Sequence, residues 1–169
     1  MYLSVNQKYA SFDSQLAKSE KNDCFVRSVA SAADIAYNVA HSFVKDVFGR
    51  VDKRGTNNMI IATQMLKAET SGLDIDGKKF AVRVLGKREV KNRYKLKGDV
   101  IWRKKTLKSF IQSHKLGTYI VTVANHALTI KDGEVLDWSS NSFLPTRKVQ
   151  AAYELVEKED SRGVQLSLF

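Results

Sequence analysis

The spacing of the apolar residues changes along this chain from a helical period to a strand period. Between residues 24 and 36 the apolar positions recur at helical spacing, as on the buried face of a helix. From Thr118 onward the period is two, so Tyr119, Val121 and Val123 fall on one face of a strand. Helices followed by strands predict an α+β fold in which N-terminal helices pack on a C-terminal antiparallel sheet.

Capping and turn residues bound the individual elements. Asn22 or Asp23 can cap the first helix, a second helix is expected at about residues 39–48, and a third begins after Thr56. The other expected elements in this region are a hairpin turn at 76–77, a strand at 80–85 and a helix from Thr106 to about residue 112.

A second Asp-Gly pair, at 132–133, predicts the hairpin that matters most for function. It separates a strand at about 127–130 from a strand at 135–138. If the pair forms a two-residue turn, Asp137 lies diagonal to His126 on the same face of the sheet. An imidazole and a carboxylate can meet at that separation.

Length and composition fit one folded domain. The chain has 169 residues, of which 43% are hydrophobic, and this is enough for a single core at residues 1–156. No stretch approaches the roughly 18 consecutive apolar residues of a membrane span, and no secretory signal opens the chain, so we expect a cytoplasmic protein without membrane contact. Cys24 is the only cysteine, which excludes an internal disulfide and thiol-rich metal sites; we expect no metal and no cofactor.

Positive charge is concentrated in one part of the chain. The formal net charge is +10, and residues 78–108 hold thirteen Lys or Arg against Glu89 and Asp99. Such a basic insert could bind nucleic acid or an acidic protein surface, because long-range attraction needs no defined pocket. The alternative is a solvated insert without a partner. The residues proposed for this basic patch are Lys87, Arg88, Lys91, Arg93, Lys95, Lys97, Arg103, Lys104 and Lys105.

Cys24 and His126 form a candidate nucleophile and base. A helix N-terminus favours the thiolate through its unpaired N–H groups and its dipole, and Cys24 opens the first long helix. His126 can accept the thiol proton, and Asp137 can orient the imidazole. His41 and His114 have no thiol or carboxylate arranged around them in the sequence, so we interpret both as surface or packing residues. The alternative is a buried structural cysteine and a structural histidine.

Four segments together resemble small papain-like cysteine peptidases, including phage-encoded ones. They are NDCFVRS at 22–28, GTYIV at 117–121, NHA at 125–127 and KDGEVLDW at 131–138. The resemblance covers the cysteine helix and the hairpin, whereas residues 72–106 match no pattern of that family. It implies a papain-like fold and three roles: Cys24 as nucleophile, His126 as base and Asp137 as the residue that orients the base.

Two positions depart from the pattern of that family. The glutamine that usually supplies an oxyanion-hole donor before the cysteine has no clear match, since Lys18 and Ser19 occupy its region; Asn22 or Gln15 could replace it. Asn125 stands where a glycine usually precedes the histidine. Loss of one oxyanion donor typically costs about 100-fold or more in rate, so an altered hole implies slow catalysis or none.

The C-terminal end resembles the short peptide by which bacterial polymerases and repair proteins bind the β sliding clamp. It follows a polar linker that begins at about residue 157, and a flexible tail suits a short apolar anchor. The alternative is a terminal strand that completes the sheet. The clamp-binding residues would be Gln165, Leu166, Ser167, Leu168 and Phe169.

Three functions follow from these patterns. The first is a cysteine peptidase or amidase with a protein or peptide substrate, which predicts a reactive Cys24. The second is a catalytically degenerate papain-like binding protein that acts through the basic patch and the tail, and whose binding is salt-sensitive. The third is a transglutaminase-like acyl transferase, in which an amine replaces water as the acceptor.

Overall fold

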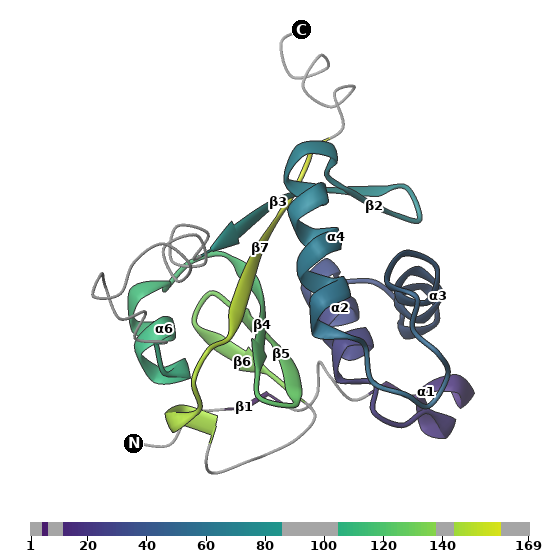
Figure 1. The fold of residues 1–169 in the computed structure, drawn as a ribbon, viewed down its shortest axis with the longest axis horizontal. Helices are drawn as coiled ribbons and strands as arrows, with labels where there is room; N and C mark the ends of the chain where they lie inside the picture. The colour runs from purple at the N-terminus through teal and green to yellow at the C-terminus, as the bar shows by residue number, and fades with distance from the viewer. Residues whose placement is uncertain (1–4, 7–11, 86–104, 138–143, 160–169) are drawn as a thin grey trace, which may run out of the picture.

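The computed structural model describes residues 5–6, 12–85, 105–137 and 144–159, and its fold is α+β (Figure 1). N-terminal helices pack on a largely antiparallel sheet, to which the second half of the chain contributes the central strands. The expected combination of N-terminal helices and a C-terminal antiparallel sheet is confirmed.

Capping residues mark the start of α4 and α6 and the end of α3. Asn57 accepts hydrogen bonds from the N–H groups of Met59 and Ile60 at 2.8 and 3.3 Å and so starts α4. Thr106 caps α6 in the same way, and Gly49 ends α3 in the left-handed conformation at φ 64°. The helices are α1 (Gln15–Ser19), α2 (Cys24–Ala33), α3 (Tyr37–Phe48), α4 (Asn58–Ser71) and α6 (Leu107–Ser113).

In the described part of the chain, seven strands form one sheet in the order β1-β6-β5-β4-β7-β3-β2. Neighbouring strands are antiparallel, except that β1 runs parallel to β6 at one edge. The strands are β1 (Val5–Asn6), β2 (Leu73–Ile75), β3 (Lys78–Leu85), β4 (Thr118–Val123), β5 (His126–Lys131), β6 (Glu134–Leu136) and β7 (Ala151–Glu157).

The expected elements before residue 137 are present, but β7 was not anticipated from the sequence. It pairs with both β4 and β3 and thereby joins the β2–β3 hairpin to the rest of the sheet. Its residues Ala152, Tyr153 and Leu155 are buried, so part of the signal was available in the sequence. The strand ends at Glu157, the residue at which we expected the polar linker to begin.

Both faces of the central sheet are covered. Ile120 of β4 belongs to the core beneath the N-terminal helices, whereas Tyr119 and Val121 belong to a second core with Leu107 and Phe110 of α6. Alternate residues of a strand point to opposite faces, so the period of two in β4 supplies both cores. Figure 1 shows α6 on the far side of the central strands from α2, α3 and α4.

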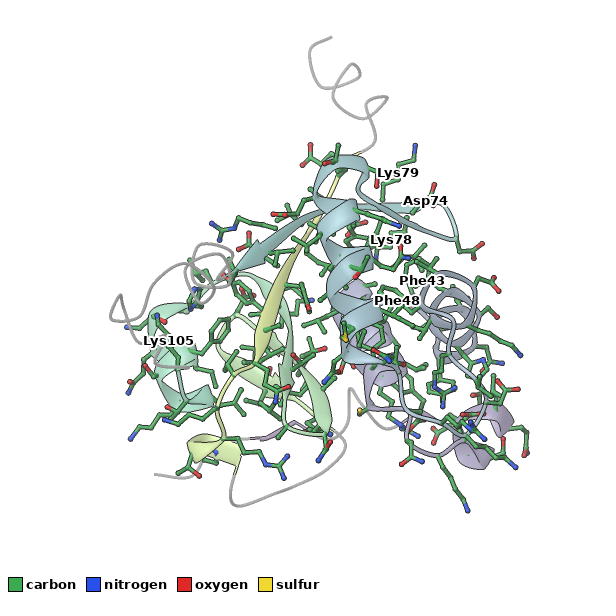
Figure 2. The ribbon with its side chains drawn as sticks, viewed as in Figure 1. Phe43, Phe48, Asp74, Lys78, Lys79 and Lys105 are labelled. Carbon is green, nitrogen blue, oxygen red and sulfur yellow. The ribbon has the colours of Figure 1, made fainter. Side chains whose placement is uncertain are left out.

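Aromatic packing joins α2 to α3. The ring of Phe48 lies edge-on to Phe25 with centroids 4.9 Å apart, and it also contacts Phe43 at 5.8 Å (Figure 2). Phe25 and Phe48 are almost fully buried. Phe25 follows Cys24 directly, so this packing holds the first turn of α2 in place.

A buried hydrogen bond ties α2 to β5. The hydroxyl of Thr129 donates to the backbone carbonyl of Ser28 at 2.8 Å, and both side chains are buried. This bond joins the helix that begins at Cys24 to the strand that begins at His126. Residues about a hundred positions apart in the sequence are therefore held next to each other.

The hairpin between β5 and β6 has the two-residue turn expected from its Asp-Gly pair. Asp132 and Gly133 have φ values of 47° and 81°, and Lys131 pairs with Glu134. The same register, extended by one residue beyond β6, places Asp137 diagonal to His126.

Several interpretations fall outside the residues that the structure describes. Of the proposed basic patch, only Lys105 is described, and the five C-terminal residues are not. Among the described residues, no helix combines the length and the apolar character needed to cross a membrane.

Candidate active site

Cys24 is the first residue of α2, and its side chain is partly buried. The side chain of Asp23 at the N-cap makes no capping hydrogen bond, so it leaves the N–H groups of the first turn free of a side-chain cap. Unpaired N–H groups and the helix dipole favour negative charge at this end of a helix. The location therefore suits a thiolate.

Asp23 instead turns into a buried network that fixes the residue before the thiol. One oxygen of its carboxylate, Oδ2, accepts from Nε of Arg27 at 3.0 Å and from the hydroxyl of Tyr37 at 2.6 Å. Burial and the neighbouring Asp23 carboxylate raise the pKa of Tyr37, so the phenol stays protonated and remains a donor. The start of α2 is thus anchored to α3.

The structure brings His126 to both Cys24 and Asp137. Nε2 of His126 lies 2.6 Å from Oδ2 of Asp137, whose side chain is only 2% exposed. Cys24 lies close enough to the imidazole to act on its pKa, and both residues line the same cleft. Because Nε2 is engaged by Asp137, the nitrogen left to face the thiol is Nδ1.

The surroundings of His126 favour its charged form. Burial alone lowers the pKa of His126, but the hydrogen bond to Asp137, the charge of Asp137 and the neighbouring Cys24 raise it from 6.5 to about 9. At neutral pH the imidazole is therefore protonated. A protonated imidazole beside a thiol at a helix N-terminus is the arrangement of a thiolate–imidazolium pair.

Asn125 occupies a position where the backbone demands an unusual conformation. Its φ is 56°, in the left-handed region that glycine adopts most easily and that asparagine tolerates better than most other residues. Asparagine therefore fits the backbone at the position before His126.

Cys24 and His126 open into one cleft of about 1130 Å³. Asn22 also lines the cleft, and its side-chain amide donates to the carbonyl of Lys53 at 3.2 Å. Gln15, the other candidate oxyanion donor, is exposed at the start of α1 and is not part of the cleft lining. Of these two candidates, Asn22 is therefore the one that lies at the cleft.

A largely buried cluster of charged residues lies beside the cleft, and the sequence did not indicate it. Arg50 donates to Glu20 at 2.5 Å and lies 3.3 Å from Nε2 of His41, which in turn is 3.5 Å from Glu20 and 3.6 Å from Asp52. His41 therefore has carboxylate partners, whereas from the sequence we expected none. The two carboxylates come from separate segments, one before α2 and one after α3, so no local motif could have indicated them.

The donor atoms of Glu20, His41 and Asp52 lie within 4.8 Å of one another, close enough to hold a metal ion. The guanidinium of Arg50 is, however, already bonded to Glu20 and His41. Burial raises the pKa of Glu20, but the bonds from Arg50 and from the N–H of Lys53 outweigh it and keep the pKa below its usual value. Arg50 thus supplies the positive charge that a cation would bring, and the cluster is a buried ion pair.

Lys105, the one described member of the proposed basic patch, is exposed and donates to the hydroxyl of Ser113 at 3.2 Å (Figure 2). It lies by α6 and does not line the cleft.

Comparison of the chain with protein-family models, with curated proteins and with solved structures found no match. The arrangement of Cys24 and the hydrogen-bonded pair His126–Asp137 at one cleft is therefore the basis for assigning a function.

Proposed function

We propose that this chain is a papain-like cysteine hydrolase that cleaves peptide or other amide bonds. The observation that carries the proposal is the hydrogen bond between His126 and the buried Asp137 at the wall of a cleft that Cys24, at the start of α2, also lines. Nucleophile, base and orienting carboxylate are the three parts that acyl transfer by a thiol requires.

In the first half of the proposed reaction, the thiolate of Cys24 attacks the substrate carbonyl carbon. The C–S bond forms while the carbonyl electrons move to oxygen. As the tetrahedral intermediate collapses, Nδ1–H of His126 gives its proton to the leaving nitrogen, and the C–N bond breaks. Asp137 keeps the proton at Nε2 and so holds the ring with Nδ1 toward the thiol.

In the second half, His126 is neutral and accepts a proton from water. The hydroxide that forms attacks the thioester carbon, the C–S bond breaks, and the thiolate returns as the leaving group. The high pKa of His126 favours recovery of the imidazolium, which restores the starting ion pair.

Negative charge on the carbonyl oxygen needs hydrogen-bond donors. The backbone N–H of Cys24 is one candidate, because the first N–H groups of a helix have no intrahelical partner. Asn22 is the other, since a side-chain amide has two hydrogens and the bond to Lys53 uses one. Asn22 therefore takes the role of the family's missing glutamine in this proposal.

A transglutaminase-like transferase would use the same residues, with an amine in place of water. The cleft is open enough for either acceptor, and the water-based reaction is the simpler because it needs no second binding site. A degenerate binding protein would not need the Cys24–His126 contact, so the reactivity of the thiol separates it from both enzymes.

The decisive experiment is the rate of alkylation of Cys24 by iodoacetamide between pH 5 and 10. Cys24 is the only cysteine, so every labelled molecule reports on it. The parent chain should react well below the pH expected for a free thiol, whose pKa is about 8.5, and His126→Ala should move the profile back toward that value. His114→Ala is the matched control, because His114 lies by α6 and outside the cleft. An ordinary profile that ignores His126 would remove the enzyme proposal.

A further inference from the structure

The negative side chains in the cleft wall are already neutralised. Glu20 is bonded to Arg50, and Asp23 is bonded to Arg27 and to the hydroxyl of Tyr37. The exposed fractions of the Glu20 and Asp23 side chains are only 3% and 5%. Neither carboxylate is therefore free to bind a positively charged group of a substrate.

Apart from the paired Arg27, the positive side chains that line the hollows are, by contrast, at least partly open to solvent. Lys18 and Lys21 line the main cleft and are exposed, and within the described part of the chain neither makes an ion pair. A second hollow of about 370 Å³ is lined by Arg147 and Lys148, which likewise have no ion-pair partner among described residues. Asn125, next to His126, lines both hollows.

The two hollows therefore meet at Asn125, the neighbour of the catalytic histidine, and the uncompensated charges among their described lining residues are all positive. A cleft lined by charges of one sign raises the local concentration of ligands of the other sign and speeds their association. The guanidinium and ammonium groups can pair with carboxylates of an extended chain that lies across the site and reaches into both hollows.

We propose that the substrate is an acidic polypeptide segment, with Asp or Glu on both sides of the bond that Cys24 attacks. This inference rests on the proposed hydrolase function, because it concerns the same cleft. A polypeptide is favoured over a nucleic acid because the thiol, imidazole and carboxylate are suited to attack on a carbonyl, which a polypeptide backbone supplies at each residue.

The test uses three six-residue peptides that differ only in charge. Each carries a chloroacetyl group on a central diaminopropionyl side chain, so the thiolate of Cys24 displaces chloride and forms a thioether that mass spectrometry detects. The residues on both sides of the centre are Glu in one peptide, Gln in the second and Lys in the third. Labelling rates are measured at low salt and again at 0.5 M salt.

Two double variants locate the effect. Lys18→Gln with Lys21→Gln changes the main cleft, and Arg147→Gln with Lys148→Gln changes the second hollow. The control, Lys79→Gln with Lys115→Gln, removes the same net charge from exposed positions outside both hollows; Lys79 lies on β3 beside the β2–β3 turn (Figure 2). Labelling by neutral iodoacetamide at the parent rate shows that a variant retains an intact thiol site.

The Glu peptide should label the parent chain faster than the Gln peptide, and the Lys peptide should be slowest. Each exposed charge pair is worth about threefold, so each site double variant should reduce the preference for Glu by about tenfold, whereas the control should leave it unchanged. The preference should shrink at 0.5 M salt, because exposed charges are then screened.

Equal rates for the three peptides would overturn the acidic-substrate inference while leaving a fast, His126-dependent thiol, and thus the hydrolase proposal, intact. A slow thiol that is indifferent to His126 would instead overturn the hydrolase proposal. If a single-stranded oligonucleotide of the same charge blocks labelling as well as the free Glu peptide does, the commitment to a polypeptide is wrong.

Discussion

Replacement of Asp137 by Asn tests how the charge of His126 is maintained. The pKa of His126 lies at about 9 rather than 6.5, a difference worth about 3 kcal/mol in favour of the charged ring in the folded protein. Asp137 contributes through a hydrogen bond and through its charge, and an opposite charge at this distance is typically worth about one to three pH units. Asn keeps the size of the side chain but removes the charge.

We therefore expect the midpoint of the His126 titration to fall by about one to three pH units in Asp137→Asn, measured from the imidazole proton signals by NMR. Because the folded pKa is raised, the stabilisation is complete below pH 6.5 and is lost as the pH rises through about 9. Urea unfolding at pH 6 should accordingly show a loss of about 1–4 kcal/mol relative to the parent chain, and the loss should shrink at pH 9.5.

Asp132→Asn is the matched control for this experiment. Asp132 lies in the turn of the same hairpin, is exposed, and accepts from the N–H of Gly117, a bond that Asn can also form. It should leave the titration of His126 unchanged. A His126 midpoint that is the same in Asp137→Asn and in the parent chain would refute the assignment of Asp137 as the group that holds the imidazole in its charged form.

Two further predictions concern the contacts that support the site. Thr129→Val removes the hydroxyl that donates to the carbonyl of Ser28. We expect urea unfolding to show a loss of about 1–2 kcal/mol in stability, and iodoacetamide labelling to show slower alkylation of Cys24. Unchanged stability would show that this bond does not hold α2 to β5. Arg50→Met leaves the carboxylate of Glu20 buried without its main partner and should cost about 3–5 kcal/mol in urea unfolding, part of which Glu20→Gln in the same chain should restore. A loss that Glu20→Gln does not reduce would argue that Arg50 acts through packing alone.

Much of the local structure could be predicted because it depends on neighbouring residues. The helical spacing after Cys24, the Thr106 cap of α6 and the period of two in β4 each act over a few positions. The Asp-Gly turn at 132–133 fixed the register of β5 and β6, and with it the diagonal relation of His126 and Asp137.

Other features could not be predicted because they depend on contacts between distant segments. β7 carries a short pattern of buried residues, but its place between β4 and β3 follows from pairing with both. The ion pair of Glu20 and Arg50 joins residues thirty positions apart, and His41 acquired its carboxylate partners through that same packing. Charge in the sequence does not reveal which charges are neutralised in the fold.

The sequence by itself determined which residues could do thiol chemistry and on which elements they lie: a single cysteine at the start of a helix, and a histidine and an aspartate in one hairpin. Only the tertiary structure decided that helix and hairpin meet, through the bond from Thr129 to Ser28 and the packing of α2 on β5. It also decided that the acidic residues of the cleft are buried in pairs while its lysines face solvent. The reason is physical: local patterns set backbone conformation, but proximity, burial and compensation of charge are properties of contacts between segments far apart in the chain.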